Sequence, residues 1–288
     1  MARIKIITDS ASDIPQSILE QYNISFLPIC VVIDDKIYRD GYDLNRKEYM
    51  QNLRTMENIP TTSMVPMAMF EEEFKKNLDE YDHQILITMS AKGSGGNNAA
   101  HLVKQQLEDE MGKELPITIL DSERYSMLYG MTAVEMAKRA SEGAELDELL
   151  EIYEKGLKSS NAYFMVDDLK HLEKGGRIKP GVALIGGLLG IKPILTVNDG
   201  LVENIGKERG RQKALEKIVN LSAAEYDTVN RPTIWVASAD SDDSCHEAIA
   251  MLNEKLDNPP IELFDIGCVI GTHAGAGLVG IIFKTKGE

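Results

Sequence analysis

The stretch IKIITDSASDIPQSILEQYNISFLPICVVI, residues 4–33, decides the fold class. Its first apolar run, Ile4–Ile7, predicts a strand, and residues Pro15–Tyr22 carry the apolar spacing of a helix. The run Ile24–Ile33 predicts a second strand that turns at Asp34-Asp35. A strand, a helix and a strand in this order are typical of a parallel sheet with helices packed on its faces.

The alternation of strands and helices continues along the N-terminal half. Further elements are predicted in turn at Ile85–Met89, 97–112, Ile117–Leu120, 127–137 and 146–157. The small, polar segment GLKSSNA, residues 156–162, indicates a domain boundary. We therefore expect a two-domain α/β protein. Residues 1–160 would form an N-terminal domain with a mainly parallel sheet, and residues 161–288 a C-terminal mixed α/β domain.

The C-terminal half contains a clear hairpin signal, because Asn198-Asp199-Gly200 separates two apolar runs. The predicted elements are the strand Tyr163–Val166, a short helix ending at KGGR (174–177), the hairpin strands Ile194–Val197 and Leu201–Ile205, a helix from Arg211, the strand Thr233–Ser238, the helix Asp243–Leu256 and the strand Ile261–Ile266.

Composition excludes several classes of function. A formal net charge of −15 argues against a nucleic-acid partner. Cys30, Cys245 and Cys268 match no metal or redox spacing, so we expect buried, reduced thiols in a cytoplasmic protein. The N-terminus reads as a strand rather than a signal peptide, and the apolar run 182–191 is too short to span a membrane. We expect a protein that is not membrane-integral and that carries no metal or cofactor.

Hydroxyl and acidic side chains follow the predicted strands of the N-terminal domain. Asp9, Ser10, Ser94 and Asp121 all lie at or just after strand ends. Ligands of open parallel sheets bind outside the carboxyl ends of strands, so these residues predict one polar rim. The alternative is that each is a helix N-cap.

A second polar group lies in IPTTSMVPMAMF, residues 59–70. Thr61, Thr62 and Ser63 precede a helix that is predicted to start at Pro66, where hydroxyls and backbone N–H groups can donate to an anion. The methionines that follow would suit a flexible hydrocarbon ligand, although methionines also fill ordinary cores.

The segment IGCVIGTHAGAGLVGIIF, residues 266–283, places His273 among glycines that allow a close approach of ligand or backbone. GAGLVG formally matches a dinucleotide fingerprint, but the chain ends too soon for the rest of that motif, and VGIIFK predicts a strand. A hydrolase is an alternative, with Ser94, His273 and Asp9 as nucleophile, base and acid. KGSGG, residues 92–96, lacks the G-x-S-x-G pattern of a nucleophile elbow.

Together these motifs resemble the DegV family, whose members bind fatty acids. The matching landmarks span the chain: IITDSASDIP (6–15), TTSMVP (61–66), KGSGG (92–96), DSERYSMLYG (121–130), FMVDDLKHLEKGGRIKPGVALIGGLLGIKPIL (164–195) and GTHAGAG (271–277).

The resemblance implies a non-enzymatic carrier that holds one long-chain fatty acid, such as palmitate, between its two domains. By motif, the carboxylate ligands would be Thr62, Ser63, Ser94, Gly95, Thr272 and His273. It also implies a partner, a separate fatty acid kinase that uses ATP and Mg²⁺ to make acyl phosphate, and a contact with it through Arg177. The glycine-rich segment 181–190 would roof the acyl tunnel, or else be an ordinary buried helix.

Departures from the family pattern lie beside the expected head-group site. They are Met64, Gly96, Asn97 and Ala276, and they leave the acyl length open. The competing hypotheses are a hydrolase or acyl or phosphoryl transferase acting at Ser94 and His273, and an interaction protein that uses its acidic surface. We expect a monomer, since no exposed heptad or long edge pattern is present.

Overall fold

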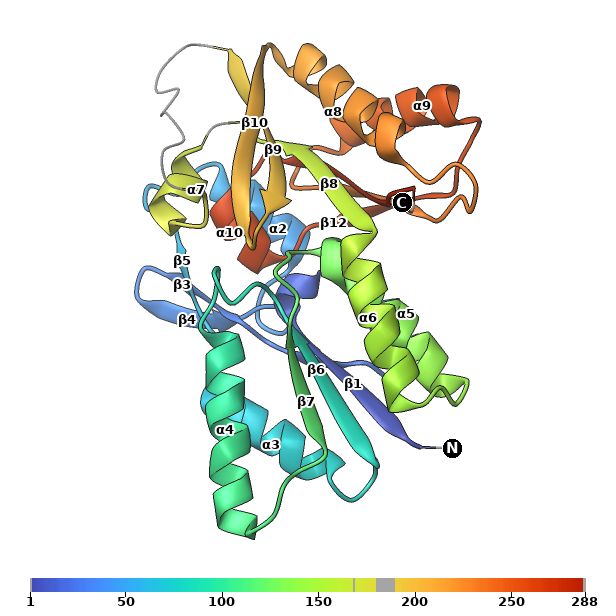
Figure 1. The fold of residues 1–288 in the computed structure, drawn as a ribbon. Helices are drawn as coiled ribbons and strands as arrows, with labels where there is room; N and C mark the ends of the chain where they lie inside the picture. Colours follow the sequence, from blue (N-terminus) through green and yellow to red (C-terminus); the bar gives the residue numbers. More distant parts are fainter. Residues whose placement is uncertain (1, 168, 180–189, 287–288) are drawn as a thin grey trace. The chain divides into compact units, whose positions relative to one another are not determined.

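A four-stranded parallel sheet, with strand order β2-β1-β6-β7, organises the first part of the chain (Figure 1). In the computed structural model, which describes residues 2–167, 169–179 and 190–286, these strands are β1 (Ile4–Asp9), β2 (Ser25–Leu27), β6 (His83–Thr88) and β7 (Ile117–Asp121). All three pairings are parallel, and Ile6 lies opposite Ile85. The predicted parallel α/β sheet is therefore confirmed.

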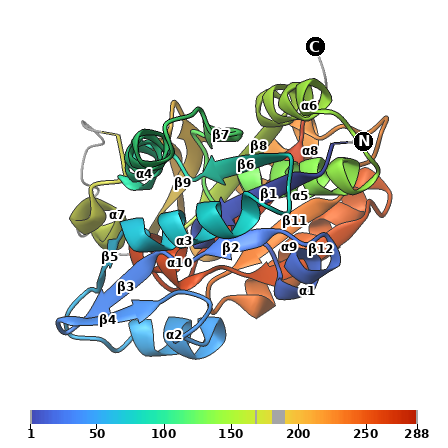
Figure 2. The same cartoon turned by 90° about the horizontal axis from the view of Figure 1, so that it is seen from below.

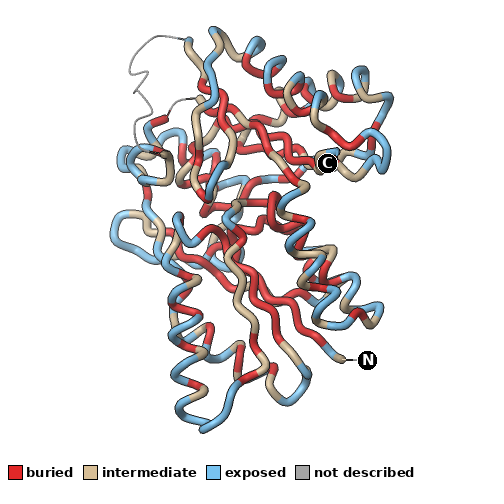
Figure 3. The backbone as a smooth tube through the Cα atoms, in the orientation of Figure 1, coloured by how far each residue is buried: buried red, intermediate tan, exposed pale blue. Residues whose placement is uncertain are grey.

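Helices cover both faces of this sheet (Figures 1 and 2). One pair is α3 (Met67–Asn77) and α4 (Gly96–Met111), and the other is α5 (Met127–Ser141) and α6 (Leu146–Lys158); a short helix, α1 (Gln16–Gln21), connects β1 to β2. The central strands β1 and β6 are buried along almost their whole length, the edge strands β2 and β7 are mostly half-buried, and each helix keeps an exposed side (Figure 3). Apolar strands buried on both faces are what a parallel sheet requires.

The predicted strand Ile24–Ile33 is wrong as a single element. It is divided into β2 and β3 (Cys30–Ile33), which belong to different sheets. Pro28 lies at the break, and proline has no N–H to donate to a sheet ladder. After the turn at Asp34-Asp35, where both residues have positive φ, β4 (Lys36–Arg39) pairs with β3.

The chain divides into two units, and each unit is built from two separate segments of the sequence. One unit holds Met1–Cys30 and Thr62–Lys158, and the other holds Val31–Thr61 and Ser159–Glu288. The segment 31–61 thus groups with the C-terminal half. It contains β3, β4 and α2 (Arg46–Leu53), and it ends at β5 (Thr61–Ser63), which completes a three-stranded sheet of order β4-β3-β5.

The second unit is built on a mixed six-stranded sheet of order β10-β9-β8-β13-β11-β12. Its strands are β8 (Ser160–Met165), β9 (Ile191–Asn198), β10 (Leu201–Arg209), β11 (Ile234–Ser238), β12 (Ile261–Asp265) and β13 (Val279–Lys284). The predicted hairpin is β9 and β10, with positive φ at Asp199 and Gly200. β11 pairs parallel with β12, and the other pairings are antiparallel.

Helices α8 (Arg211–Glu225) and α9 (Asp242–Leu256) pack on this sheet through a core that includes Met165, Ile218 and Val236. Two short helices, α7 (Lys170–Gly175) and α10 (Cys268–Ala274), pack against each other, and α10 also packs against α2. Across the described ranges, no helix combines the length and apolar character needed to cross a bilayer. The proposed roof segment lies, except for Gly190, outside the described residues.

Candidate functional site

The His–Gly segment forms a short helix, α10, that the sequence did not predict. Glycines let neighbouring side chains approach it closely. A Cβ at Gly271 would overlap the end of the Met50 side chain, and one at Gly277 would overlap the Asp167 carboxylate. Gly275 follows the helix with a φ of +82°, and a Cβ there would lie 3.0 Å from the His171 ring. Each glycine therefore accommodates a particular neighbour.

Thr272 anchors α10 to α2. Its hydroxyl donates to the Cys268 carbonyl at 2.7 Å and lies 2.6 Å from the Tyr49 hydroxyl. A threonine hydroxyl carries one hydrogen, so Tyr49 is the donor of the second bond. Thr272 is 1% exposed. Because its hydrogen is already donated, Thr272 fixes the helix rather than offering a donor to a ligand.

His273 lies on the next position of α10, against the end of α7. Its Nδ1 occupies the space that a Cβ on Gly175 would need. Burial, followed by the charges of Arg177 and His171, lowers the pKa of the His273 imidazole to about 4. At neutral pH the ring is therefore uncharged, and it carries one N–H donor and one acceptor nitrogen.

This lowered pKa predicts a pH-dependent stability. The ordinary histidine pKa is 6.5, so between that value and about 4 the unfolded chain binds the proton that folded His273 refuses. The free energy of unfolding should fall as the pH drops through this window. His273→Gln removes the titrating group, so its unfolding free energy should fall less steeply. Urea unfolding of both proteins from pH 4 to pH 7 measures the slopes, and equal slopes would contradict the prediction.

Arg177 follows the C-terminus of α7. Gly176 ends the helix in the left-handed conformation, with a φ of +70°. Arg177 then folds back, and its guanidinium donates to the Gly175 carbonyl. The side chain is half-buried, and its charge acts on His273.

An ionic group braces the loop that follows α10. Asp167 accepts hydrogen bonds from Lys192 at 2.7 Å and from Arg211 at 2.9 Å. Arg211 also donates to the carbonyl of Gly277 and to the hydroxyls of Ser241 and Ser244. These bonds tie the end of β8 to the starts of α8 and α9 and to the Gly275-Ala276-Gly277 loop (the GAG loop).

In the first unit, Asp9 is a structural carboxylate at the end of β1. Its oxygens accept from the N–H of Ala11 and of Met89 and from the Tyr129 hydroxyl, at 3.1, 2.8 and 2.6 Å. Burial and the neighbouring Asp9 raise the pKa of Tyr129 well above its ordinary value, so Tyr129 remains a donor. Asp9 caps the following 3-10 turn, as the alternative interpretation of this residue expected, which does not suit the acid of a catalytic triad.

Removing the Tyr129 hydroxyl should therefore lower the free energy of unfolding. In Tyr129→Phe the buried Asp9 carboxylate loses the phenol donor, and we expect a loss of about 1–3 kcal/mol of unfolding free energy. Tyr153→Phe is the matched control, because its half-buried hydroxyl donates to a backbone carbonyl, that of Asp121. Urea unfolding measures both. A Tyr129→Phe protein as stable as the control would contradict this assignment.

The other rim residues are also partly engaged. The hydroxyl oxygen of Ser10 accepts from the N–H of Ile29 at 3.1 Å. The Asp121 carboxylate accepts from the N–H of Ala91 and of Glu123 at 2.9 and 3.0 Å. Both residues therefore stabilise turns at the carboxyl ends of the strands.

Ser94 differs from its neighbours. Its hydroxyl oxygen accepts from the N–H of Gly96 at 3.3 Å, and among the described residues its hydrogen has no acceptor. The side chain is half-buried, so it keeps a donor for a ligand. Gly95 is exposed, and a Cβ on it would lie 3.2 Å from the sulfur of Met64. The loop at Ser94 and Gly95 thus lies beside Met64, the residue that follows Ser63.

Thr62 and Ser63 are consecutive in β5, so their side chains point to opposite faces of the strand. Thr62 is half-buried and Ser63 is exposed. One carboxylate cannot therefore meet both hydroxyls from the same face.

Three of the departures from the family pattern are Asn97, Gly96 and Ala276. Asn97 donates to the Thr88 hydroxyl at 3.1 Å, in the first turn of α4. Gly96 is buried, and a Cβ there would be in ordinary contact with the Ser94 hydroxyl at 3.5 Å. Ala276 is half-buried in the GAG loop, and nothing in the structure explains it.

All three cysteines are free and buried, and burial raises the pKa of Cys245 to about 11. Among the residues that the structure describes, no group of three or more His, Cys, Asp or Glu side chains could hold a metal ion.

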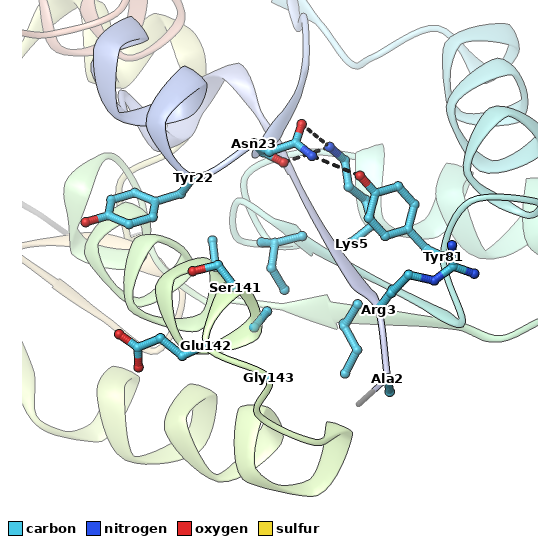
Figure 4. Close-up of a pocket in the computed structure, with 13 residues that line it drawn as sticks. Ala2, Arg3, Lys5, Tyr22, Asn23, Tyr81, Ser141, Glu142 and Gly143 are labelled. Carbon is cyan, nitrogen blue, oxygen red and sulfur yellow. Dashed lines mark hydrogen bonds between the residues drawn. The ribbon is translucent and has the colours of Figure 1, made fainter.

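A cavity of about 330 Å³ lies at the other end of β1, beside the end of α5 (Figure 4). The Lys5 ammonium there donates to Asn23 at 2.7 and 2.9 Å, and it lies 5.4 Å from the centroid of the Tyr81 ring. Arg3 pairs with Asp82. Both cationic side chains are thus already bonded to protein groups. None of the candidate site residues lines this cavity.

The sequence did not indicate the residues that hold α10. Tyr49 and Met50 lie in no recognised motif, and Tyr49 is 223 positions from its partner Thr272. Asp167 and His171 lie in the landmark 164–195, but the sequence indicated no role for either. The glycines at 271, 275 and 277 indicated that other groups approach this segment closely. They did not indicate which side chains those groups are.

Comparison with known proteins gives a consistent result. The model of a family described as uncharacterised proteins of the DegV family matches residues 3–286. A DegV domain-containing protein of Listeria monocytogenes is 34% identical over 287 residues, which are 99% of each chain. These matches confirm the resemblance noted in the sequence.

Two solved structures share the fold over almost the whole chain. A DegV family protein from Thermus thermophilus, described by its fatty acid binding, is 30% identical with a TM-score of 0.84, over 99% of this chain and 100% of that one. DegV from Bacillus subtilis, described as a fatty acid binding protein, is 29% identical with a TM-score of 0.86 over the same shares.

Proposed function

Because the chain belongs to the DegV family, we propose that it binds one long-chain fatty acid, such as palmitate, and presents the carboxylate to a separate fatty acid kinase. The observation that carries the proposal is the full-length match, in sequence and in fold, to proteins described as fatty acid binding. In this proposal the chain is a carrier and does no chemistry itself.

In this proposal the carboxylate is bound by hydroxyl and imidazole groups. We assign this role to the hydroxyls of Ser94 and Thr62 and to the imidazole of His273. A carboxylate removed from water needs charge-assisted hydrogen bonds, and hydroxyl and imidazole donors provide them. Gly95 leaves backbone exposed beside Ser94. Ser63 lies next to Thr62 on the opposite face, so its contribution is through the backbone. Thr272 positions α10.

The acyl chain supplies most of the affinity. Each methylene buried from water contributes about 0.8 kcal/mol. The exposed Met64, beside Gly95, is suited to contact the first methylenes of the chain, because a thioether adapts to irregular apolar shapes.

Arg177 is the proposed contact with the kinase. It follows the C-terminus of α7, two positions after Gly175, on which the His273 ring lies. Transfer of a phosphoryl group to the bound carboxylate needs positive charge near the developing negative charge, and an arginine at the partner contact is suited to orient the complex.

Single replacements test the carboxylate site. Ser94→Ala should weaken palmitate binding at least tenfold, since it removes a hydrogen bond to a charged group. Ser141→Ala, an exposed serine on α5, is the control and should bind as the wild type does. Binding is measured by titration with labelled palmitate.

The same proteins separate the carrier from an enzyme. The wild type should not turn over palmitoyl esters or palmitoyl phosphate. Turnover that is lost in both Ser94→Ala and His273→Gln would favour a hydrolase or transferase instead.

A further inference from the structure

We propose that His171 is a positioning residue for His273: it fixes the last turn of α10 and so orients the imidazole that, in the function proposed above, binds the fatty acid carboxylate.

The first contact is a hydrogen bond at the end of α10. His171 Nδ1 lies 2.9 Å from the Thr272 carbonyl oxygen. A carbonyl can only accept, so Nδ1 carries the hydrogen. Because α10 ends at Ala274, the Thr272 carbonyl lies in the last turn, where carbonyls have no partner within the helix.

This bond acts on the backbone of His273 itself. The carbonyl of Thr272 and the nitrogen of His273 belong to the same planar peptide unit. Fixing the carbonyl therefore fixes the plane from which the His273 side chain departs.

The second contact is an exchange of rings and glycines between two helices. The His171 ring packs on Gly275, where a Cβ would lie 3.0 Å from the ring. One turn after His171, Gly175 leaves the space that the His273 ring occupies. Thus His171 of α7 lies on Gly275 at the end of α10, and His273 of α10 lies on Gly175 at the end of α7. The two contacts constrain one another.

Loss of the His171 ring would release both constraints. The Thr272 carbonyl would lose its donor, and the last turn of α10 would be free to move. The His273 ring would then leave its place on Gly175 and meet more solvent. Its affinity for a carboxylate should fall, and its titration should approach that of an exposed histidine.

Two replacements of His171 separate positioning from mere packing. His171→Leu keeps bulk but removes the donor. His171→Asn places an amide N–H where Nδ1 stands. His101→Leu, which changes an exposed histidine on α4, is the control. Palmitate affinity is measured for each, and the His273 ring is titrated by NMR in histidine-labelled protein without ligand.

We expect His171→Leu to weaken palmitate binding about tenfold or more, and to raise the titration midpoint of His273 by about one pH unit or more towards that of an exposed histidine. His171→Asn should restore most of both, and His101→Leu should change neither. His171→Leu and His171→Asn both remove the imidazole charge, so restoration by His171→Asn reports positioning rather than charge. The inference is overturned if the His273 midpoint in His171→Leu equals that of the wild type, or if His171→Asn restores neither the midpoint nor the affinity, whatever happens to thermal stability. If the wild-type protein binds no fatty acid, the proposed function fails, and the His273 midpoint still decides the role of His171.

Discussion

Gly175→Ala should abolish fatty acid binding while leaving the protein folded. The backbone of Gly175 is an ordinary helical conformation, so alanine costs little there by itself. Its Cβ, however, would overlap the Nδ1 of His273, and the imidazole must leave its position. Because the ring is a rigid body on a short side chain, it cannot make room by bending. We expect at least a hundredfold loss of palmitate affinity, which corresponds to about 2.7 kcal/mol.

Gly206→Ala is the matched control for this replacement. Gly206 lies in β10, and a Cβ there would meet its nearest neighbour, Ile194, at 4.0 Å. Circular dichroism and thermal melting check that both variants fold, and titration with labelled palmitate measures affinity. Wild-type affinity in Gly175→Ala would mean that the place of His273 on Gly175 has no part in binding.

Gly277→Ala should cause the largest loss of stability of the glycine replacements around α10. Gly277 has a φ of +98°, which L residues rarely adopt, and this alone costs about 1–3 kcal/mol. The added Cβ would also overlap the Asp167 carboxylate, which accepts from Lys192 and Arg211. Displacing Asp167 would leave these two cations without their shared partner. We expect a total loss of at least about 3 kcal/mol of unfolding free energy.

The measurement is urea unfolding, with Asp167→Asn as the companion variant. Asp167→Asn weakens the ionic group but leaves the backbone of Gly277 unstrained, so it should cost less than Gly277→Ala. If the two variants lose equal stability, the strain at Gly277 contributes nothing.

Local signals predicted those parts of the fold that depend on local chemistry. The β9–β10 hairpin was predicted because Asp199 and Gly200 are residues that tolerate positive φ, and both adopt it. The strand-and-helix order of the first unit followed from apolar periodicity. The error at Ile24–Ile33 arose because apolar character was weighed above Pro28, whose missing N–H separates β2 from β3.

The residue types of the candidate site could be predicted from the sequence, but the contacts that hold these residues could not. The hydroxyls and His273 were identified from their sequence neighbours. That α10 is a helix was not predictable, because Gly271 within it opposes helix formation and Gly267 and Gly275 flank it closely. It is held instead by Met50, Tyr49 and His171, which are distant in sequence. Nor does the motif TTS show that Thr62 and Ser63 face opposite ways, since that follows only once β5 is known to be a strand.

Denaturing extraction of the purified protein, followed by mass spectrometry of the released lipids, tests directly whether this chain carries a fatty acid. We predict close to one long-chain fatty acid per chain in the wild type and a reduced amount in Ser94→Ala. A wild-type protein that releases no fatty acid, and that takes up none when palmitate is added, would contradict the proposed fatty acid binding.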